Sequence, residues 1–440
     1  MKPELEKYAG MRICVALSGG RDSMALAHYL LAHAEKFNIT LSALNCDHGI
    51  RGEQSRKDSA FVKKWCEDNG LRLYSYARTD GISKDELSAR RWRLSCYADA
   101  YASMRSDGTP ESACAIATAH HADDVAETVL FNISRGSGTA GAAGIRDAVI
   151  NGVNIIRPLL SCSRVEIDEY VRANGVPFVD DNTNFSTDYT RNAIRLTVLP
   201  QLEKAVSGAA ENICRFSRLA AEDEDFFNAL IIGRKIVTSL YGFPFIVICK
   251  ERPLFKRAAL KVIKGYGKTD YSNEILERLY GLQFNENGKI FNFLGLTACK
   301  TDGGLIVSPQ SDGKVTAEIP LCDFLCGKRD IFAGQPLVIT TQTTGQTATN
   351  SNYKTLKFSV DAIPENAVVR NMKAGDRFEK FGGGTKNLGD YFTDKKIPKS
   401  IRGAIPLIAG GNEILAVCGI EISDKIKVTQ KTEKIGHIIY

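Results

Sequence analysis

The chain of 440 residues is 44% apolar and 25% charged, which is typical of a soluble globular protein with two or three domains. It has no uncharged apolar run of about 18 residues that could span a membrane and no apolar leader in its first ten residues, so we expect a cytoplasmic protein. Its twelve cysteines stand mostly alone in apolar segments without zinc-ligand spacing, so buried, reduced thiols are expected rather than a zinc or iron–sulfur site.

Strand and helix patterns alternate over the first 200 residues. Strands are predicted at 11–17, 39–47, 71–78 and 113–121, and helices at 22–36, 53–70, 84–104, 122–134 and 161–175. Ser163 and Glu166 have the spacing of a capping box, and Gly175 is placed to end the last of these helices. This alternation predicts an α/β fold: a Rossmann-like parallel sheet with helices on both faces and a ligand at the carboxyl ends of its strands.

The pattern changes near residue 202. Amphipathic helices are predicted at 205–231 and around 273–282, and β-type runs follow at 303–309, 335–344 and 356–360. We therefore expect a first domain at 1–205, a mainly helical middle region with a linker at 206–350, and a small α+β carboxyl-terminal domain at 351–440. From Val368 onwards there are 13 Lys and Arg against 8 Asp and Glu, so most of the net charge of +6 lies there. That excess indicates either a solvated surface or a domain that touches nucleic acid.

The stretch SGGRDS, from Ser18 to Ser23, lies between the first predicted strand and the first helix. Its glycines permit close backbone approach, and the N–H groups of a helix start favour a bound phosphate, although a plain strand–helix turn is the alternative. The patterns G-x-x-x-x-G-K-[ST] and G-x-G-x-x-G are absent, so the lysine that grips a transferred phosphate is missing. Asp22 would repel a phosphate unless a cation lay between them, which predicts Mg²⁺ at this carboxylate.

A second group of polar residues follows the fourth predicted strand. In HHADDVAET, the residues His120, Asp124 and Glu127 are spaced i, i+4, i+7 and share one helical face, whereas His121 and Asp123 are predicted to point elsewhere. The face follows the fourth strand, at the predicted ligand edge of the sheet, so its residues are candidates for a functional site. Alternatively, they serve the dipole of an ordinary helix N-terminus.

These motifs together carry a resemblance to a known family. Ser-Gly-Gly-x-Asp-Ser resembles the pyrophosphate-loop signature of adenine nucleotide α-hydrolase-like enzymes, which cleave ATP between the α- and β-phosphates. NCDHGIRGEQSRKD, LSARRWRLSCY and ATAHHADDVAETVLFNISRGSGTAGAAGI resemble motifs of the tRNA(Ile)-lysidine synthases, as do RPLLSCSRVEIDEY, DDNTNFSTDYTRNAIRLTVLPQL and the segment 369–408. Ile50 replaces a usual Leu and Leu94 a usual Tyr, and the resemblance covers residues 11–205 and about 366–425.

The resemblance implies an enzyme that joins free lysine to the wobble cytidine of the isoleucine tRNA with a CAU anticodon. ATP and Mg²⁺ would be required, and an adenylylated cytidine would be the intermediate; no membrane partner is implied, and a homodimer is left open. The residues implied in nucleotide binding are Ser18, Gly19, Gly20, Arg21, Asp22 and Ser23. The residues implied in catalysis are Asp22, Arg90, His120, Asp124 and Glu127, with Asp22 and Glu127 as metal ligands and Asp124 and Glu127 also as candidates for holding lysine.

Cations outside these motifs are candidates for tRNA contact. Arg135 lies in a glycine-rich stretch, 134–144, which is either a linker or a loop that closes over the substrates. Arg191 and Arg195 lie near one helical face, which is either solvated or in contact with tRNA or ATP. The carboxyl-terminal domain is implied to bind tRNA through interleaved cations and aromatic residues, including Arg370, Arg377, Lys386 and Lys396 with Phe378, Phe381, Tyr391 and Phe392.

Three other hypotheses about the function of the protein remain open. A tRNA thiolation enzyme of the same superfamily would need catalytic cysteines, usually in Cys-x-x-Cys, which this chain lacks. A small-molecule amidotransferase or synthetase would not need a basic carboxyl-terminal domain. A non-catalytic nucleotide- or RNA-binding protein would not need Asp22 together with the acidic face at Asp124 and Glu127.

Overall fold

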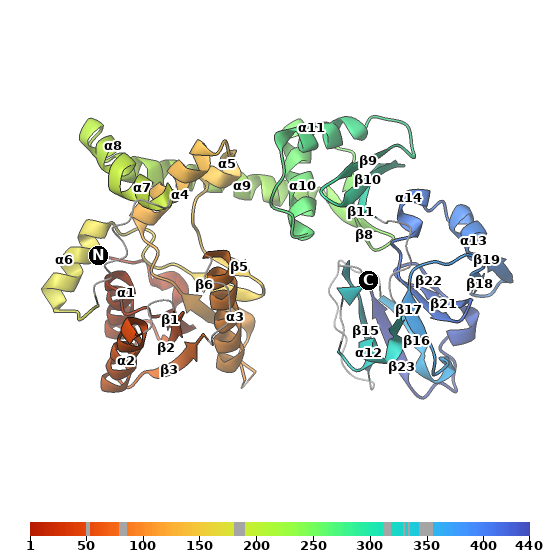
Figure 1. Cartoon of the computed structure of the whole chain (residues 1–440), viewed down its shortest axis with the longest axis horizontal. Coiled ribbons are helices and arrows are strands. Elements are labelled where there is room, and N and C mark those ends of the chain that lie inside the picture. Colours follow the sequence, from red (N-terminus) through yellow and green to blue (C-terminus); the bar gives the residue numbers. More distant parts are fainter. Residues whose placement is uncertain are drawn as a thin grey trace. The chain divides into compact units, whose positions relative to one another are not determined.

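The computed structural model of the chain describes residues 1–49, 53–78, 86–106, 108–179, 190–310, 318–328, 331–332, 335–342 and 355–440 (Figure 1). The motif residues Ile50 and 180–189 and the predicted boundary at residue 350 lie outside these ranges. The chain divides into two compact units, Met1–Asp225 and Phe226–Tyr440, while the predicted boundary at 205 stays a prediction. Among the described helices, none is both long and apolar enough to cross a membrane.

The first unit contains the predicted parallel sheet. Its elements are β1 (Arg12–Ala16), α1 (Arg21–His33), β2 (Thr40–Asp47), α2 (Glu53–Asp68), β3 (Arg72–Ala77), α3 (Glu86–Met104), β4 (Cys114–Ala117), α4 (Ala122–Ser134), α5 (Thr139–Ala142), β5 (Ala148–Ile150), β6 (Val153–Ile156), α6 (Arg164–Asn174), α7 (Thr190–Ala193), a π-helical turn (Ile194–Val198), α8 (Leu199–Ala205) and most of α9 (Ala209–Gly233). The strand order is β3-β2-β1-β4-β6-β5, and only β5 runs antiparallel to its neighbour.

Both faces of this sheet are covered by helices. Successive residues of a strand point to opposite faces, so neighbouring side chains of β1 pack against different helices. Ile13 and Val15 of β1 are buried in a core with side chains of α1, α2 and α6, whereas Cys14 between them is buried with Tyr97 and Tyr101 of α3. Each fully buried apolar side chain of this kind stabilises the fold by roughly 1.5–3 kcal/mol relative to exposure. The α/β fold with helices on both faces is thereby confirmed.

Local signals in the sequence set the start of α6 and the ends of α6 and α2, as expected. The Ser163 side chain accepts from the Glu166 backbone N–H, the Glu166 carboxylate accepts from the Ser163 N–H, and Gly175 ends α6 with φ of 61°. Gly70, with φ of 64°, follows the end of α2. Ser163 and Glu166 therefore determine where α6 begins, and Gly175 and Gly70 determine where α6 and α2 end.

The second unit is built from several small sheets. Its elements are β7 (Val237–Leu240), β8 (Phe243–Val247), α10 (Arg252–Gly265), α11 (Asn273–Leu282), β9 (Ile290–Phe293), β10 (Leu296–Thr301), β11 (Gly304–Pro309), β12 (Ile319–Pro320), α12 (Leu321–Leu325), β13 (Ile331–Phe332), β14 (Gln335–Pro336), β15 (Val338–Gln342), β16 (Thr355–Ser359), β17 (Val368–Arg370), β18 (Arg377–Glu379), β19 (Thr385–Asn387), α13 (Leu388–Asp394), α14 (Lys399–Arg402), β20 (Leu407–Gly410), β21 (Glu413–Val417), β22 (Glu421–Ile422) and β23 (Ile435–Ile439).

The middle region combines its helices with a sheet that the sequence patterns did not indicate in full. Strands β7-β8-β11-β10-β9 form a five-stranded sheet, of which the sequence suggested only the run that became β11. The other strands are four to six residues long, too short for a clear alternation of apolar and polar positions. The carboxyl-terminal part is α+β, with a mixed sheet β12-β17-β20-β21-β18-β19 and a three-stranded sheet β15-β23-β16.

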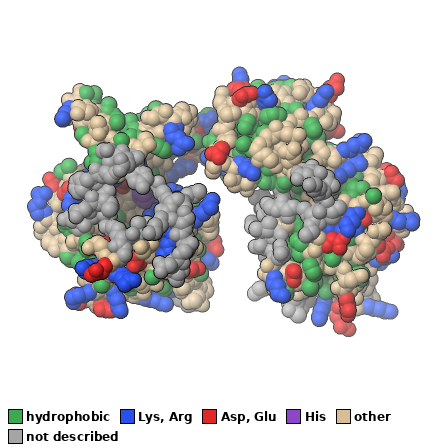
Figure 2. Space-filling model, viewed as in Figure 1, with side chains coloured by type: hydrophobic (Ala, Val, Ile, Leu, Met, Phe, Trp, Pro, Cys, Tyr) green, Lys and Arg blue, Asp and Glu red, His purple; other side chains and the backbone are tan. Residues whose placement is uncertain are grey.

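The aromatic residues of this carboxyl-terminal part form its core. Phe378, Tyr391 and Phe392 are fully buried, so the expectation that these three aromatics contact tRNA is wrong, and of the four aromatics only Phe381 is exposed. Cations stand near them in the sequence for two reasons. Arg377 and Phe378 are successive residues of β18, so one is exposed and the other is buried, whereas Lys386 and Lys395 lie just outside α13, which itself has no cation. Figure 2 shows Lys and Arg side chains of this unit interspersed with Asp and Glu on the face that it draws.

Arg370 is also buried, which corrects its assignment as a solvated or tRNA-binding cation. Its guanidinium donates two hydrogen bonds to the carboxylate of Asp376, at 2.9 and 2.8 Å, and further ones to the carbonyls of Asn371 and Gly411. Asp376 also accepts from the Lys373 backbone N–H. Such a buried pair is not by itself a large source of stability, but removing one partner leaves the other as an uncompensated buried charge.

Replacing Asp376 by Ala should destabilise the second unit by about 3–5 kcal/mol, because the buried Arg370 would lose its hydrogen-bonded counter-charge and keep only the exposed Glu318, 3.9 Å from its Nε. The measurement is the unfolding midpoint of the full chain in urea, followed by circular dichroism. The control is Asp394→Ala, which removes an exposed carboxylate paired with Lys386 and should shift the midpoint far less. Equal shifts for the two variants would contradict this account of the buried pair.

Candidate active site

A cleft of about 1730 Å³ lies at the carboxyl ends of β1 and β4, where the strand pattern placed the ligand. Chain connections leave these two neighbouring strands towards opposite edges of the sheet, and such a switch point opens a crevice between them. The predicted site residues that line the cleft are Ser18, Gly20, Arg21, Asp22, Ser23, Arg90, His120, Glu127, Arg191 and Arg195.

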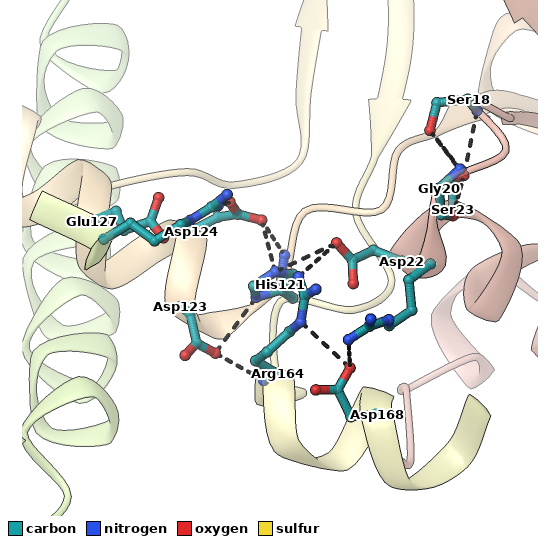
Figure 3. Close-up of polar contacts among 12 residues, drawn as sticks. Ser18, Gly20, Asp22, Ser23, His121, Asp123, Asp124, Glu127, Arg164 and Asp168 are labelled. Atoms are coloured by element: carbon teal, nitrogen blue, oxygen red, sulfur yellow. Dashed lines mark hydrogen bonds and ion pairs between the residues drawn. The ribbon is translucent and has the colours of Figure 1, made fainter. Parts of the chain in front are cut away.

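The loop between β1 and α1 is held in shape by its own hydroxyl groups (Figure 3). The Ser18 and Ser23 oxygens are 3.1 Å apart, the Gly20 N–H donates to Ser18 Oγ, and the Ser23 hydroxyl donates to the Gly20 carbonyl. Gly19 has φ of 84°, and a Cβ there would lie 3.3 Å from Val62 Cγ2 of α2. Both features favour glycine and bring the loop backbone close to the sheet edge.

Arg21 points away from this loop towards α6. Its guanidinium donates to Asp168 Oδ1 at 2.8 Å and lies over the ring of Phe178, with 4.8 Å to the ring centroid. Asp168 also lies 3.5 Å from Nε of Arg164, so the two arginines share one carboxylate. This contact braces the start of α1 against α6, while a role of Arg21 in nucleotide binding stays a prediction.

Asp22 is the loop residue that faces the acidic helix. Its Oδ2 accepts from Arg164 at 3.0 Å and lies 3.9 Å from His121 Nε2 (Figure 3). Its Oδ1 is buried and has no hydrogen-bond partner among the residues that the structure describes. Burial raises the pKa of Asp22, although the charges of His121 and Arg164 oppose the rise. An oxygen without a partner at this position suits a cation ligand.

His121 lies at the centre of the acidic cluster, so the expectation that His121 and Asp123 point elsewhere is wrong. The His121 ring is 3.5 Å from carboxylate oxygens of both Asp123 and Asp124, and its backbone N–H donates to Asp124 (Figure 3). Helical spacing was not the right guide here, because His121 is the N-cap of α4 and has extended backbone dihedrals. Burial alone would lower the pKa of His121, but the surrounding carboxylates raise it.

His120 behaves differently from its neighbour. Its Nδ1 lies 2.9 Å from the hydroxyl oxygen of Thr118, and the side chain faces the cleft. Burial lowers the pKa of His120 to about 4, despite the attraction of Asp124. His120 is therefore neutral at pH 7 and can act as a hydrogen-bond partner rather than as a cation.

Glu127 and Asp124 lie side by side and are held by arginines. Arg195 donates from Nε to Glu127 Oε1 at 2.5 Å and from Nη2 to Asp124 Oδ1 at 2.9 Å. Arg191 is farther, with Nε 3.5 Å from Glu127 Oε2, and it donates to the Thr128 hydroxyl. Burial raises the pKa of Glu127 against the effect of Arg195. The structure thus brings Asp124 and Glu127 together, and it shows that they hold a cationic side chain.

The remaining predicted residues are spread over the chain. Arg90 lies on the cleft wall with Arg93 and Arg157, which supply positive charge there. Arg135 follows α4 as an exposed side chain over the ring of Phe131 and is not among the cleft residues. The tRNA candidates of the second unit, Arg377, Lys386 and Lys396, are all exposed.

Two residues of the site were missed from the sequence. Arg164 bridges Asp22 on α1 and Asp168 on α6, and its backbone N–H donates to Asp123. Asn45 at the end of β2 is buried in the cleft and donates to the Leu17 carbonyl. Arg164 follows a capping-box serine like any first residue of a helix, so only the packing of α6 against α1 marks it.

The acidic cluster fits a magnesium ion only in part. Over the residues that the structure describes, no three His, Cys, Asp or Glu side chains are arranged as a metal site. Mg²⁺ bound with substrate phosphates needs only one or two carboxylates, and water completes its octahedron. Asp22 Oδ1, buried without a hydrogen bond beside the phosphate loop, fits that requirement best.

His121 should make the stability of the first unit depend on pH. Because the pKa of His121 is raised in the folded protein, its contribution is fully present below about pH 6.5 and is lost as the pH rises through the folded value. The thermal midpoints of the native chain and of His121→Gln should therefore differ most in acid and converge above neutrality. A difference that stays constant from pH 5.5 to 9 would contradict the charge of His121.

The chain matches two family models. Residues 2–202 match the PP-loop domain and residues 367–439 match the TilS substrate C-terminal domain. A tRNA(Ile)-lysidine synthase of Caldanaerobacter subterraneus subsp. tengcongensis is 31% identical, over 99% of this chain and 96% of the relative. Another, of Clostridium acetobutylicum, is 30% identical over 97% and 95%. With the pyrophosphate loop and the acidic cluster at one sheet edge, these matches show that the chain belongs to the tRNA(Ile)-lysidine synthase family.

Proposed function

We propose that this protein uses ATP to ligate free lysine to the wobble cytidine of the isoleucine tRNA with a CAU anticodon. The observation that carries the proposal is the meeting, in one cleft, of a phosphate-type loop (Ser18–Ser23) and the buried carboxylate of Glu127. Glu127 and the neighbouring Asp124 together hold a cation, the guanidinium of Arg195. The first part suits the triphosphate of ATP, and the second suits the amine of lysine.

The first step would activate the cytidine. The carbonyl oxygen of the base attacks the α-phosphorus of ATP, the bond to the β-phosphate oxygen breaks, and pyrophosphate leaves. The loop N–H groups and the Ser18 and Ser23 hydroxyls would hold the leaving group, and Arg90 would add positive charge from the cleft wall. Asp22 would hold Mg²⁺, which when bound neutralises part of the phosphate charge. Neutral His120 would donate a hydrogen bond to the nucleotide.

In the second step, lysine would displace AMP from the adenylylated cytidine. The ε-amine attacks the ring carbon, the bond from that carbon to the adenylylated oxygen breaks, and AMP leaves with the oxygen. Free lysine arrives as an ammonium, since its pKa is about 10.4, so a base must take a proton. Glu127 has a pKa raised by burial and would accept the proton from the ammonium that it binds. Glu127 is therefore assigned here to lysine rather than to magnesium.

The second unit would bind the body of the tRNA. Arg377, Lys386 and Lys396 are exposed cations of its carboxyl-terminal part, and they can approach a phosphate backbone without rearrangement of the core. Because the neighbouring aromatics are buried, this contact would be electrostatic rather than based on stacking.

The reaction can be tested directly with purified protein, ATP, Mg²⁺, labelled lysine and the CAU-anticodon tRNA transcript. Lysine should enter the tRNA, with AMP and pyrophosphate released in equal amounts. A transcript with uridine at the wobble position is the matched control and should remain unlabelled. Failure to label the CAU transcript, with the protein folded and the transcript intact, would refute the proposal.

Asp22→Ala should lower the rate of lysine incorporation by about 10²–10³-fold, the scale of losing one electrostatic contact to a transition state. Its tRNA affinity, measured by filter binding, should not change. The control is Asp68→Ala, which removes an exposed carboxylate on α2 that pairs with Lys64. If Asp68→Ala is as slow as Asp22→Ala, the loss is not specific to the loop.

Replacing Arg377, Lys386 and Lys396 together by Ala should weaken tRNA binding and also flatten its dependence on salt. Each phosphate contact that is lost should reduce the slope of log K against log salt by roughly 0.7–0.9. Retained affinity for ATP would show that the first unit is intact. An unchanged salt slope would mean that these three cations do not touch the backbone.

A further inference from the structure

The carboxylate pair assigned to lysine is already engaged by a side chain of the protein. Glu127 and Asp124 each accept a hydrogen bond from the guanidinium of Arg195, at 2.5 Å and 2.9 Å respectively. The Glu127 side chain is 1% exposed, so it cannot exchange this partner for bulk water. A buried carboxylate needs a cation beside it, whichever cation that is.

Arg195 itself is free to move in a way that Glu127 is not. Its side chain is 34% exposed, and it belongs to the π-helical turn Ile194–Val198 between α7 and α8. A π-helical turn is an infrequent conformation that is found often at functional sites. Arg195 also lines the same cleft as Ser18, Asp22 and Ser23 of the phosphate loop.

We propose that Arg195 is an internal substitute for substrate lysine, which leaves Glu127 and Asp124 when the phosphates of ATP bind in the cleft. The guanidinium then pairs with phosphate oxygens, and the ε-ammonium of lysine takes over the vacated carboxylates. Lysine binding is thereby coupled to ATP binding, so the amine is admitted only when a base can be adenylylated. This inference rests on the proposed function, because it takes the ligands of the cleft to be ATP and lysine.

The exchange is chemically balanced. Arg195 trades two carboxylate oxygens for phosphate oxygens, and guanidinium is well suited to both because its fork donates bidentately. The carboxylate pair trades a guanidinium for an ammonium, so the buried charge stays compensated throughout. Arg191 lies 3.5 Å from Glu127 and 4.0 Å from Asp124, at ion-pair rather than hydrogen-bond distance, and it donates its hydrogen bond to the Thr128 hydroxyl. It can therefore stay in place while Arg195 and lysine exchange.

The test is equilibrium dialysis of labelled lysine against the full chain, with and without α,β-methylene ATP, which cannot be cleaved at the reacting bond. In the native protein the analogue should raise lysine affinity about 10-fold or more, within the usual range of coupling between two ligands. In Arg195→Gln, lysine should bind without the analogue nearly as tightly as with it. Arg195→Lys should restore the dependence, because its ammonium can occupy the carboxylates again.

Arg172→Gln is the matched control, since Arg172 is an exposed arginine of α6 and should keep the full dependence on nucleotide. Equal lysine affinity with and without the analogue in the native protein would overturn the inference, and that measurement requires no variant to fold. So would an Arg195→Gln protein that is folded and keeps the native dependence. If the native protein does not label the CAU transcript, the proposed function fails; if it labels the transcript without the coupling, only this inference fails.

Discussion

The site depends on how negative charge is buried where β1 and β4 end. Asp22, Asp123, Asp124 and Glu127 converge there, and none of them has enough exposure to be solvated as a free carboxylate would be. They are compensated by His121 at the N-cap of α4, Arg164 on α6 and Arg195 on the π-helical turn. A buried charge that lost such a partner would cost several kcal/mol, so the cluster ties these elements together.

The same compensation explains why two adjacent histidines differ. His121 is surrounded by three carboxylates, which outweigh its burial, so its pKa is raised. His120 is buried beside Thr118 with fewer opposite charges, so its pKa is lowered and it stays neutral. The imidazole whose protonated form is favoured therefore lies among the acidic residues, while the neutral one faces the cleft. Two adjacent histidines thus have different roles: one stabilises the acidic cluster, and the other is available for hydrogen bonding in the cleft.

Much of the fold could be predicted from periodicity. The run 13–17 is apolar throughout because both faces of β1 are covered, and the capping residues of α6 are local signals that need no tertiary context. The five-stranded sheet of the second unit could not be predicted in full, since its strands are short and several of their residues are half-exposed. Phe378, Tyr391 and Phe392 were misjudged for a related reason, as their spacing among cations does not tell which face of the element is inward.

The sequence by itself determined the parallel sheet, the loop Ser18–Ser23 at its edge and the presence of Asp22, Asp124 and Glu127 near that edge. Those features follow from local spacing and from the rule that parallel strands end together. Only the tertiary structure decided that His121 turns into the cluster, that Arg21 and Arg164 share Asp168, and that Arg195 holds the carboxylate pair. These contacts join residues up to about 150 positions apart, and the sign of a charge in the sequence does not say which opposite charge it will meet.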